Sequence, residues 1–143
     1  LGVENRTSIS EYQMEQWVAE GAVEYLGETS DVIPYIVASS CVVLPSYREG
    51  TSRVLLAAAA IGRPVVASDV PGCREVIENG VNGFLFKSRD VDDLVEKIEL
   101  VITSTHRERL TMGFNGRLKV EKEFDKAVVN DIYEKAVNEV LAR

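Results

Sequence analysis

Residues 45–64 read PSYREGTSRVLLAAAAIGRP and follow directly on a short apolar segment, Cys41 to Leu44. We expect a strand at that segment, a turn around Gly50, and a helix from Arg53 to Ile61. The start of a helix attracts anions, because its first N–H groups have no partner within the helix and its dipole is positive there. The passage therefore predicts a strand–turn–helix unit whose turn can receive an anion.

Similar apolar runs recur along the chain, bounded by Gly, Pro, Asp or Asn: Val23 to Leu26, Cys41 to Leu44, Val65 to Ala67 and Phe84 to Phe86. Such runs are typical of strands that a parallel sheet buries on both faces. Helical stretches alternate with them: Ser10 to Glu20, Asp31 to Ser39 and Arg53 to Ile61. This alternation predicts the α/β class, with an open, doubly wound parallel sheet that binds ligands at the carboxyl ends of its strands.

From Asp90 onward we expect three amphipathic helices whose apolar stripes pack on the domain. The stripes are Leu94, Val95, Ile98 and Ile102; then Leu110, Phe114 and Leu118; then Val129, Tyr133, Val137 and Leu141. No linker or repeat is evident, so residues 1–143 are expected to form a single domain. The chain begins with Leu1 and Gly2, which look like the end of an earlier strand and suggest a fragment of a longer protein.

The composition excludes several classes of protein. The chain has 143 residues, of which 45% are hydrophobic and 27% charged, as expected for a globular domain. Its net charge of −7 argues against a nucleic acid or an anionic membrane surface as the main partner, because either needs a basic footprint. No apolar run approaches the roughly 18 residues of a membrane span. The two cysteines lack the spacing of a metal site.

The distance between positions 49 and 57 suits a nucleotide sugar. Eight residues of helix rise about 12 Å, and both positions then look toward roughly the same side. A nucleotide sugar lying along the helix start would place its hexose near Glu49 and its ribose near Ala57. A carboxylate at position 49 can accept hydrogen bonds from sugar hydroxyls. The N–H groups near the diphosphate would be those of Gly50, Thr51 and Ser52.

Four ordered blocks of sequence resemble one family: VEYLG at 23–27, LPSYREG at 44–50, GRPVVASDVPGCRE at 62–75 and NGVNGFL at 79–85. In these blocks the chain resembles the retaining glycosyltransferases of family four, which have the GT-B fold. The versions YREG and PGCRE are most similar to members that build capsule, O-antigen or polyprenyl-linked glycans. The resemblance implies that the chain is the Rossmann-like, donor-binding C-terminal half of a two-domain transferase.

The resemblance also implies the reaction. A hexose would pass, with retained configuration, from a UDP- or GDP-linked sugar to a glycan or polyprenyl-diphosphate-linked acceptor, and no cofactor or bound metal would be needed. The acceptor site and a basic pair that grips the diphosphate would belong to parts of the enzyme preceding this chain. We therefore expect the fragment alone to be inactive, and the whole enzyme to be cytoplasmic, at the inner face of the cell membrane.

Within the helix-start region, the resemblance gives Glu49 the contact with the transferred sugar, as the catalytic residue. It gives the sugar and phosphate contacts to Gly50, Thr51 and Ser52. The family usually has a second Glu, which holds the ribose, where this chain has Ala57. Ala57 is either a helix-forming residue that packs well or the mark of a lost ribose contact. In the second case, the chain would be a nucleotide-sugar-binding module that has lost catalysis.

Other candidate residues lie nearby. Tyr25 and Gly27 lie where the family places the base. Arg48 and Arg53 either neutralise the diphosphate or are simply solvated. Arg74 and Glu75 either line the acceptor side of the cleft or form an ion pair at a helix start, which contributes little.

Overall fold

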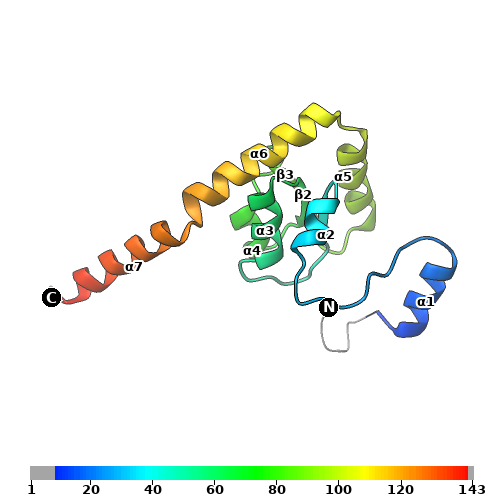
Figure 1. Ribbon diagram of the computed structural model, residues 1–143, viewed down its shortest axis with the longest axis horizontal. Coiled ribbons are helices and arrows are strands. Elements are labelled where there is room, and N and C mark those ends of the chain that lie inside the picture. Colours follow the sequence, from blue (N-terminus) through cyan, green and yellow to red (C-terminus); the bar gives the residue numbers. More distant parts are fainter. Residues whose placement is uncertain (1–8, 142–143) are drawn as a thin grey trace. The chain divides into compact units, whose positions relative to one another are not determined.

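The strand–turn–helix unit expected around Gly50 is present in the computed structural model, which describes residues 9–141 (Figure 1). Strand β1 (Val42–Leu44) leads through the turn into helix α3 (Arg53–Ile61). The helix ends at Gly62, which has the left-handed φ of 80° that glycine adopts without strain. The bounds of α3 are the predicted ones, because this glycine ends the helix.

The chain divides into two compact units, Leu1–Val32 and Ile33–Arg143. The described part of the first unit contains α1 (Glu11–Ala19), and the side chain of Ser10 caps this helix by accepting a hydrogen bond from the N–H of Gln13. The second unit contains the sheet and the remaining helices. In chain order these are α2 (Ile33–Ala38), β1, α3, β2 (Val65–Ser68), α4 (Pro71–Val76), β3 (Gly83–Phe86), α5 (Val91–Thr103), α6 (His106–Glu123) and α7 (Lys126–Leu141).

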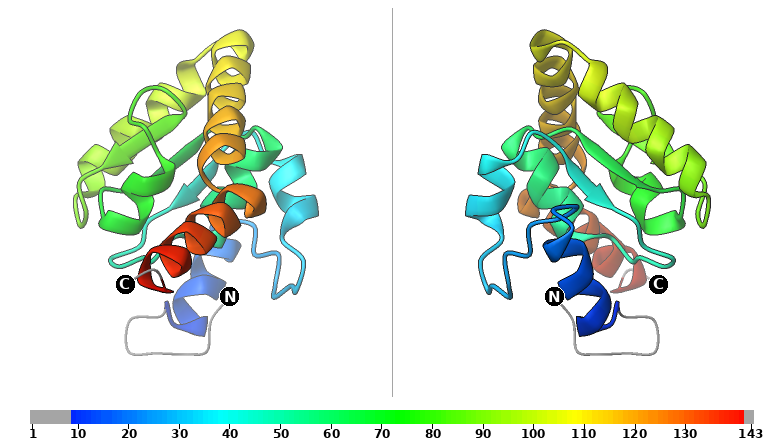
Figure 2. Two further views of the ribbon diagram at one scale, coloured as in Figure 1. Left: turned by 90° about the vertical axis from the view of Figure 1, so that its left-hand side faces the viewer. Right: turned by 90° about the vertical axis from the view of Figure 1, so that its right-hand side faces the viewer.

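The three strands of the described residues form a parallel sheet in the order β1–β2–β3. All four residues of the central strand β2 are buried. Val66 packs with α5 on one face of the sheet, and Val65 and Ala67 pack with α3 and α4 on the other. Figure 2 shows α5 and α2 on opposite sides of the sheet. A parallel sheet covered by helices on both faces confirms the predicted α/β class.

The prediction of a strand at Val23 to Leu26 is wrong. These residues lie after α1, and the structure assigns no strand to them. Their side chains are also open to solvent, with exposed fractions of 42% for Val23 and 55% for Leu26. An apolar run becomes a strand only where a neighbouring strand offers hydrogen bonds, and residues 9–32, the described part of its own compact unit, contain no strand.

The expectation that the stripe of Leu110, Phe114 and Leu118 packs on the domain is also wrong, because α6 presents a different face. These three side chains are 47% to 59% exposed, whereas Gly113 is buried. A Cβ atom at Gly113 would lie 1.9 Å from the carbonyl oxygen of Gly62, so only glycine permits this backbone contact. The contact fixes the rotation of α6 and turns the stripe outward.

The other two predicted stripes pack only in part. Leu94 and Ile98 of α5 pack against the sheet, while Ile102 is 71% exposed. On α7, Tyr133 and Leu141 are exposed. No helix among residues 9–141 is long and apolar enough to cross a membrane.

Asn82 holds the connection between α4 and β3. Its side chain is 2% exposed; Nδ2 donates to the carbonyl of Val76 at 2.9 Å, and Oδ1 accepts from the N–H of Glu78 at 2.8 Å. Replacing Asn82 by alanine leaves both backbone groups without these partners. We expect the free energy of unfolding, measured with urea, to fall by about 2 kcal/mol. The exposed Asn130 serves as the control, and its replacement by alanine should change that value by less than about 0.5 kcal/mol.

Candidate functional site

The segments that follow the three strands meet at the carboxyl edge of the sheet, where open α/β sheets bind their ligands. The segment after β1, which we call the Glu49 turn, comprises residues 46–52. It is in contact with α4, the helix after β2, and with the segment after β3. The candidate site is therefore the Glu49 turn with its two neighbours.

Glu49 is half-buried and held by a neighbour in the same turn. The hydroxyl of Ser46 donates to Glu49 Oε1 at 2.6 Å. No other hydrogen bond to this carboxylate occurs within residues 9–141, which leaves Oε2 available to a ligand. A carboxylate fixed in this way can accept hydrogen bonds from the hydroxyls of a sugar.

The start of α3 offers backbone N–H groups next to Glu49. Ser52 is the N-cap residue, is 6% exposed, and makes no capping hydrogen bond with its side chain. The first-turn N–H groups thus have no capping side chain in the described chain, and the helix dipole adds positive potential there. Gly50 has open space where a Cβ atom would be and does not have a left-handed φ. The fold itself therefore does not require glycine at this position.

Gly72, by contrast, is required by close packing. A Cβ atom at Gly72 would lie 2.0 Å from the carbonyl oxygen of Gly50 and 2.5 Å from that of Glu49. The first turn of α4 therefore lies directly against the backbone of the Glu49 turn. Burial, and then the carboxylates of Glu49 and Asp69, raise the pKa of the adjacent Cys73 thiol to about 11. This thiol is neutral at physiological pH and is not a nucleophile.

Arg74 and Glu75 point to different partners. Arg74 Nε contacts Asp69 Oδ1 at 2.5 Å, and this hydrogen bond raises the pKa of the arginine. Both side chains are about half-exposed, so this pair contributes little stability. Glu75 instead reaches the Glu49 turn, where its Oε2 accepts a hydrogen bond of 2.6 Å from the hydroxyl of Thr51. The structure thus brings Glu75 together with the predicted phosphate-binding residues.

The remaining predicted residues are placed as follows. Arg48 and Arg53 are both exposed, one before Glu49 and one at the start of α3. Ala57 is half-buried and packs against the core. Tyr25 and Gly27 belong to the first compact unit, so their contact with a base stays a prediction.

Arg89, which follows β3, is a further residue of this site that was not predicted from the sequence. Its guanidinium carbon lies 5.2 Å from the centre of the Tyr47 ring, a cation–π contact with the residue just before Arg48. Arg89 also has a φ of 67°, in the left-handed region that non-glycine residues seldom adopt. No sequence motif indicated this contact, because it joins two segments 42 positions apart.

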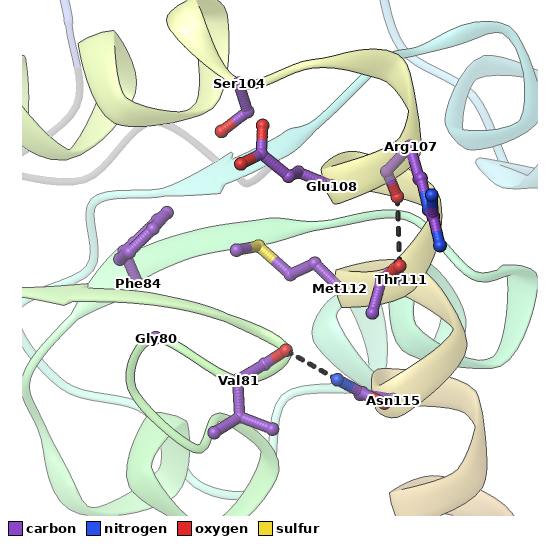
Figure 3. A pocket seen from close by; sticks show the side chains of 9 residues that line it. All are labelled: Gly80, Val81, Phe84, Ser104, Arg107, Glu108, Thr111, Met112 and Asn115. Atoms are coloured by element: carbon purple, nitrogen blue, oxygen red, sulfur yellow. Dashed lines mark hydrogen bonds between the residues drawn. The ribbon is translucent and has the colours of Figure 1, made fainter.

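A hollow of about 530 Å³ lies away from the Glu49 turn, between α6 and the segment that precedes β3 (Figure 3). Val81, Phe84 and Met112 supply its apolar side chains. Asn115 closes one side by donating to the carbonyl of Val81 at 3.1 Å. This hollow is near the amino end of β3, opposite to the edge at which such sheets bind ligands. We therefore place the candidate site at the Glu49 turn.

Comparison with known proteins connects this geometry to one family. The family model described as glycosyl transferases group 1 matches residues 2–104. A Campylobacter jejuni protein, N,N'-diacetylbacillosaminyl-diphospho-undecaprenol alpha-1,3-N-acetylgalactosaminyltransferase, is 33% identical over 126 residues, which are 88% of this chain and 33% of that protein. The Staphylococcus aureus capsular polysaccharide biosynthesis glycosyltransferase CapM is 32% identical over 119 residues, 83% of this chain and 31% of its own. The chain thus spans about a third of the length of these relatives.

Solved structures agree with the fold. The crystal structure of Anabaena Alr3699/HepE in complex with UDP superposes with a TM-score of 0.80 at 28% identity, and covers 90% of this chain and 35% of that one. The same protein in complex with UDP-glucose gives a TM-score of 0.78. These likenesses confirm the fold class and the family resemblance expected from the sequence.

Proposed function

The chain belongs to the glycosyl transferases group 1 family, and from this premise we propose that it binds the nucleotide-sugar donor of a hexosyltransferase. The observation that carries the proposal is the Glu49 turn itself. Its carboxylate has one oxygen fixed by Ser46, and it stands beside a helix start without a capping side chain. The first feature suits sugar hydroxyls and the second suits a diphosphate. The similarity to a protein whose structures contain UDP and UDP-glucose supports the same ligand class.

In the proposed reaction, Glu49 contacts the transferred sugar, while the N–H groups of Gly50, Thr51 and Ser52 stabilise charge on the diphosphate. Stabilising the leaving group in this way lowers the barrier to transfer. Transfer with retained configuration and without a bound metal is part of the proposal.

The relatives named above include a transferase named for a diphospho-undecaprenol substrate and one named for capsular polysaccharide. We propose an acceptor of this lipid-linked or glycan class, reached in the cytoplasm through parts of the enzyme beyond this chain.

A second candidate is a nucleotide-sugar-binding module without catalysis, which Ala57 favours. A small, half-buried methyl group cannot accept a hydrogen bond from a ribose. The two candidates differ in how the affinity for the sugar part depends on Glu49. A catalytic donor site should bind a nucleotide sugar through Glu49. In a module without catalysis, the affinity for the nucleotide sugar should not depend on that residue.

Replacing Ala57 by glutamate is expected to tighten the binding of UDP. Position 57 lies in α3, about one helical turn after its start at Arg53. A carboxylate there can accept hydrogen bonds from the ribose hydroxyls, and a bond to a charged group contributes about 1.5–3 kcal/mol. The dissociation constant measured by calorimetry should therefore fall by about tenfold or more. Replacement of the exposed Ala60 by glutamate, on the same helix, is the control and should leave it unchanged. Equal affinities for the wild type and Ala57→Glu would exclude a ribose contact at this position.

The proposed function is tested by titrating the chain with UDP, GDP and UDP-glucose. Saturable binding of a nucleoside diphosphate is expected, weakened by replacement of Gly50 with alanine. That substitution places a methyl group in the open space beside the backbone without disturbing the fold. Absence of saturable binding for every nucleotide, in a chain shown to be folded, would refute the proposal.

A further inference from the structure

We propose that Glu75 is a positioning residue for the donor site: it fixes Thr51 so that the N–H groups of the Glu49 turn face the diphosphate. This inference rests on the proposed function. The family resemblance left Glu75 either on the acceptor side of a cleft or in an ion pair at a helix start. The structure instead joins its carboxylate to Thr51, 24 positions earlier in the chain.

The hydrogen bond determines what Thr51 can offer a ligand. Its hydroxyl proton is donated to Glu75 Oε2 at 2.6 Å, a short distance typical of a bond to a charged acceptor. A hydroxyl has a single proton to donate, so this one is not available to a phosphate oxygen. Thr51 therefore contributes its backbone N–H to the anion site, and its side chain sets the orientation of that peptide.

A second contact of α4 acts on the same turn. Gly72, in the first turn of α4, packs against the carbonyl oxygens of Glu49 and Gly50. Glu75, one helical turn later, holds Thr51. Two successive peptides of the Glu49 turn are thus supported from one side, and their other side is left open at Gly50. Such support from a neighbouring element keeps binding groups oriented before the ligand arrives.

Electrostatics makes the alternative role distinguishable. A carboxylate close to a diphosphate repels it, so a Glu75 that had no positioning role would weaken binding. Removing it would then tighten the binding of UDP. Under the positioning role the sign is reversed, because loss of the Thr51 hydrogen bond frees the turn to adopt other orientations.

The test measures UDP affinity by calorimetry for four variants of the chain. Glu75→Ala and Thr51→Val are each expected to weaken binding about fivefold, since each removes the same exposed hydrogen bond. The double variant should be no weaker than either single one, as expected when two residues act through one contact. Glu75→Gln keeps an acceptor oxygen for Thr51 and should bind UDP within about twofold of the wild type.

Glu78→Ala is the matched control, because it removes an exposed carboxylate three positions away and should leave UDP affinity unchanged. Because the bond is exposed, melting temperatures of all variants should agree within about 2 °C, which separates positioning from a general loss of stability. UDP affinity in Glu75→Ala equal to or higher than that of the wild type would overturn the inference. So would losses in the two single variants that multiply in the double one.

Amide hydrogen exchange of the free chain tests the inference separately from donor binding. The N–H groups of Thr51, Ser52 and Arg53 should exchange faster in Glu75→Ala than in Glu78→Ala. A wild-type chain that binds no nucleotide would refute the proposed function, and this exchange measurement would still decide the role of Glu75. Unchanged exchange at these three positions would refute that role.

Discussion

Replacing Gly72 by alanine is expected to lower the free energy of unfolding by about 3 kcal/mol, which is among the largest effects of a single methyl group in this chain. The added Cβ atom would lie 2.0 Å from the carbonyl oxygen of Gly50. Non-bonded contacts between carbon and oxygen atoms are far longer than this. The oxygen that the Cβ atom would meet belongs to the backbone, which cannot rotate away as a flexible side chain does. Either α4 or the Glu49 turn must therefore move.

Urea unfolding of Gly72→Ala and of Gly50→Ala measures this effect with a matched control. Among residues 9–141, none apart from the two chain neighbours of Gly50 has an atom within 4 Å of the Cβ that alanine would add there, so the same chemical change should cost less than about 1 kcal/mol. The displaced turn of Gly72→Ala should also lose affinity for UDP. Equal stabilities of the two variants would show that α4 does not press on the Glu49 turn.

The second large effect concerns Glu49. Replacing it by glutamine is expected to weaken the binding of UDP-glucose by about ten- to a hundredfold, because hydrogen bonds from the sugar hydroxyls to a charged acceptor are lost. The amide oxygen of glutamine can still accept the hydrogen bond from Ser46, so the turn should keep its shape. The binding of UDP alone should change by less than about twofold, since UDP has no hexose to contact this residue.

Calorimetric titrations of the wild type and Glu49→Gln with both ligands measure this difference. Replacing the exposed Glu78 by glutamine is the control for the loss of one negative charge. An equal loss of affinity for UDP and for UDP-glucose would show that Glu49 acts on the UDP part of the donor and not on the sugar. An unchanged affinity for both ligands would favour the module that has lost catalysis.

Local signals in the sequence predicted the strand–turn–helix unit well. Gly62 ends α3 where expected, and the apolar runs of β1, β2 and β3 lie within a residue of their predicted bounds. These elements are specified by residues within themselves or at their ends. The same holds for the position of Glu49 and the helix start, which follow directly from the order strand, turn, helix.

Features that depend on distant partners were not predictable in this way. Val23 to Leu26 has the composition of a strand, but the described part of its own compact unit, residues 9–32, contains no strand with which it could pair. The apolar stripe of α6 is exposed because Gly113 fixes the packing against Gly62. Glycine has no side chain, so this contact does not show in the hydrophobic pattern of the helix. The contact between Thr51 and Glu75 joins separate elements, and only the folded backbone brings them together.

The most direct test of donor binding at the Glu49 turn is a titration of the isotope-labelled chain with UDP, followed by the amide signals in nuclear magnetic resonance spectra. The largest saturable shifts are predicted for Gly50, Thr51 and Ser52, whose N–H groups lie at the start of α3. Shifts that are largest at Gly80, Val81 and Asn115 would place the ligand in the hollow beside α6 and contradict the proposed site.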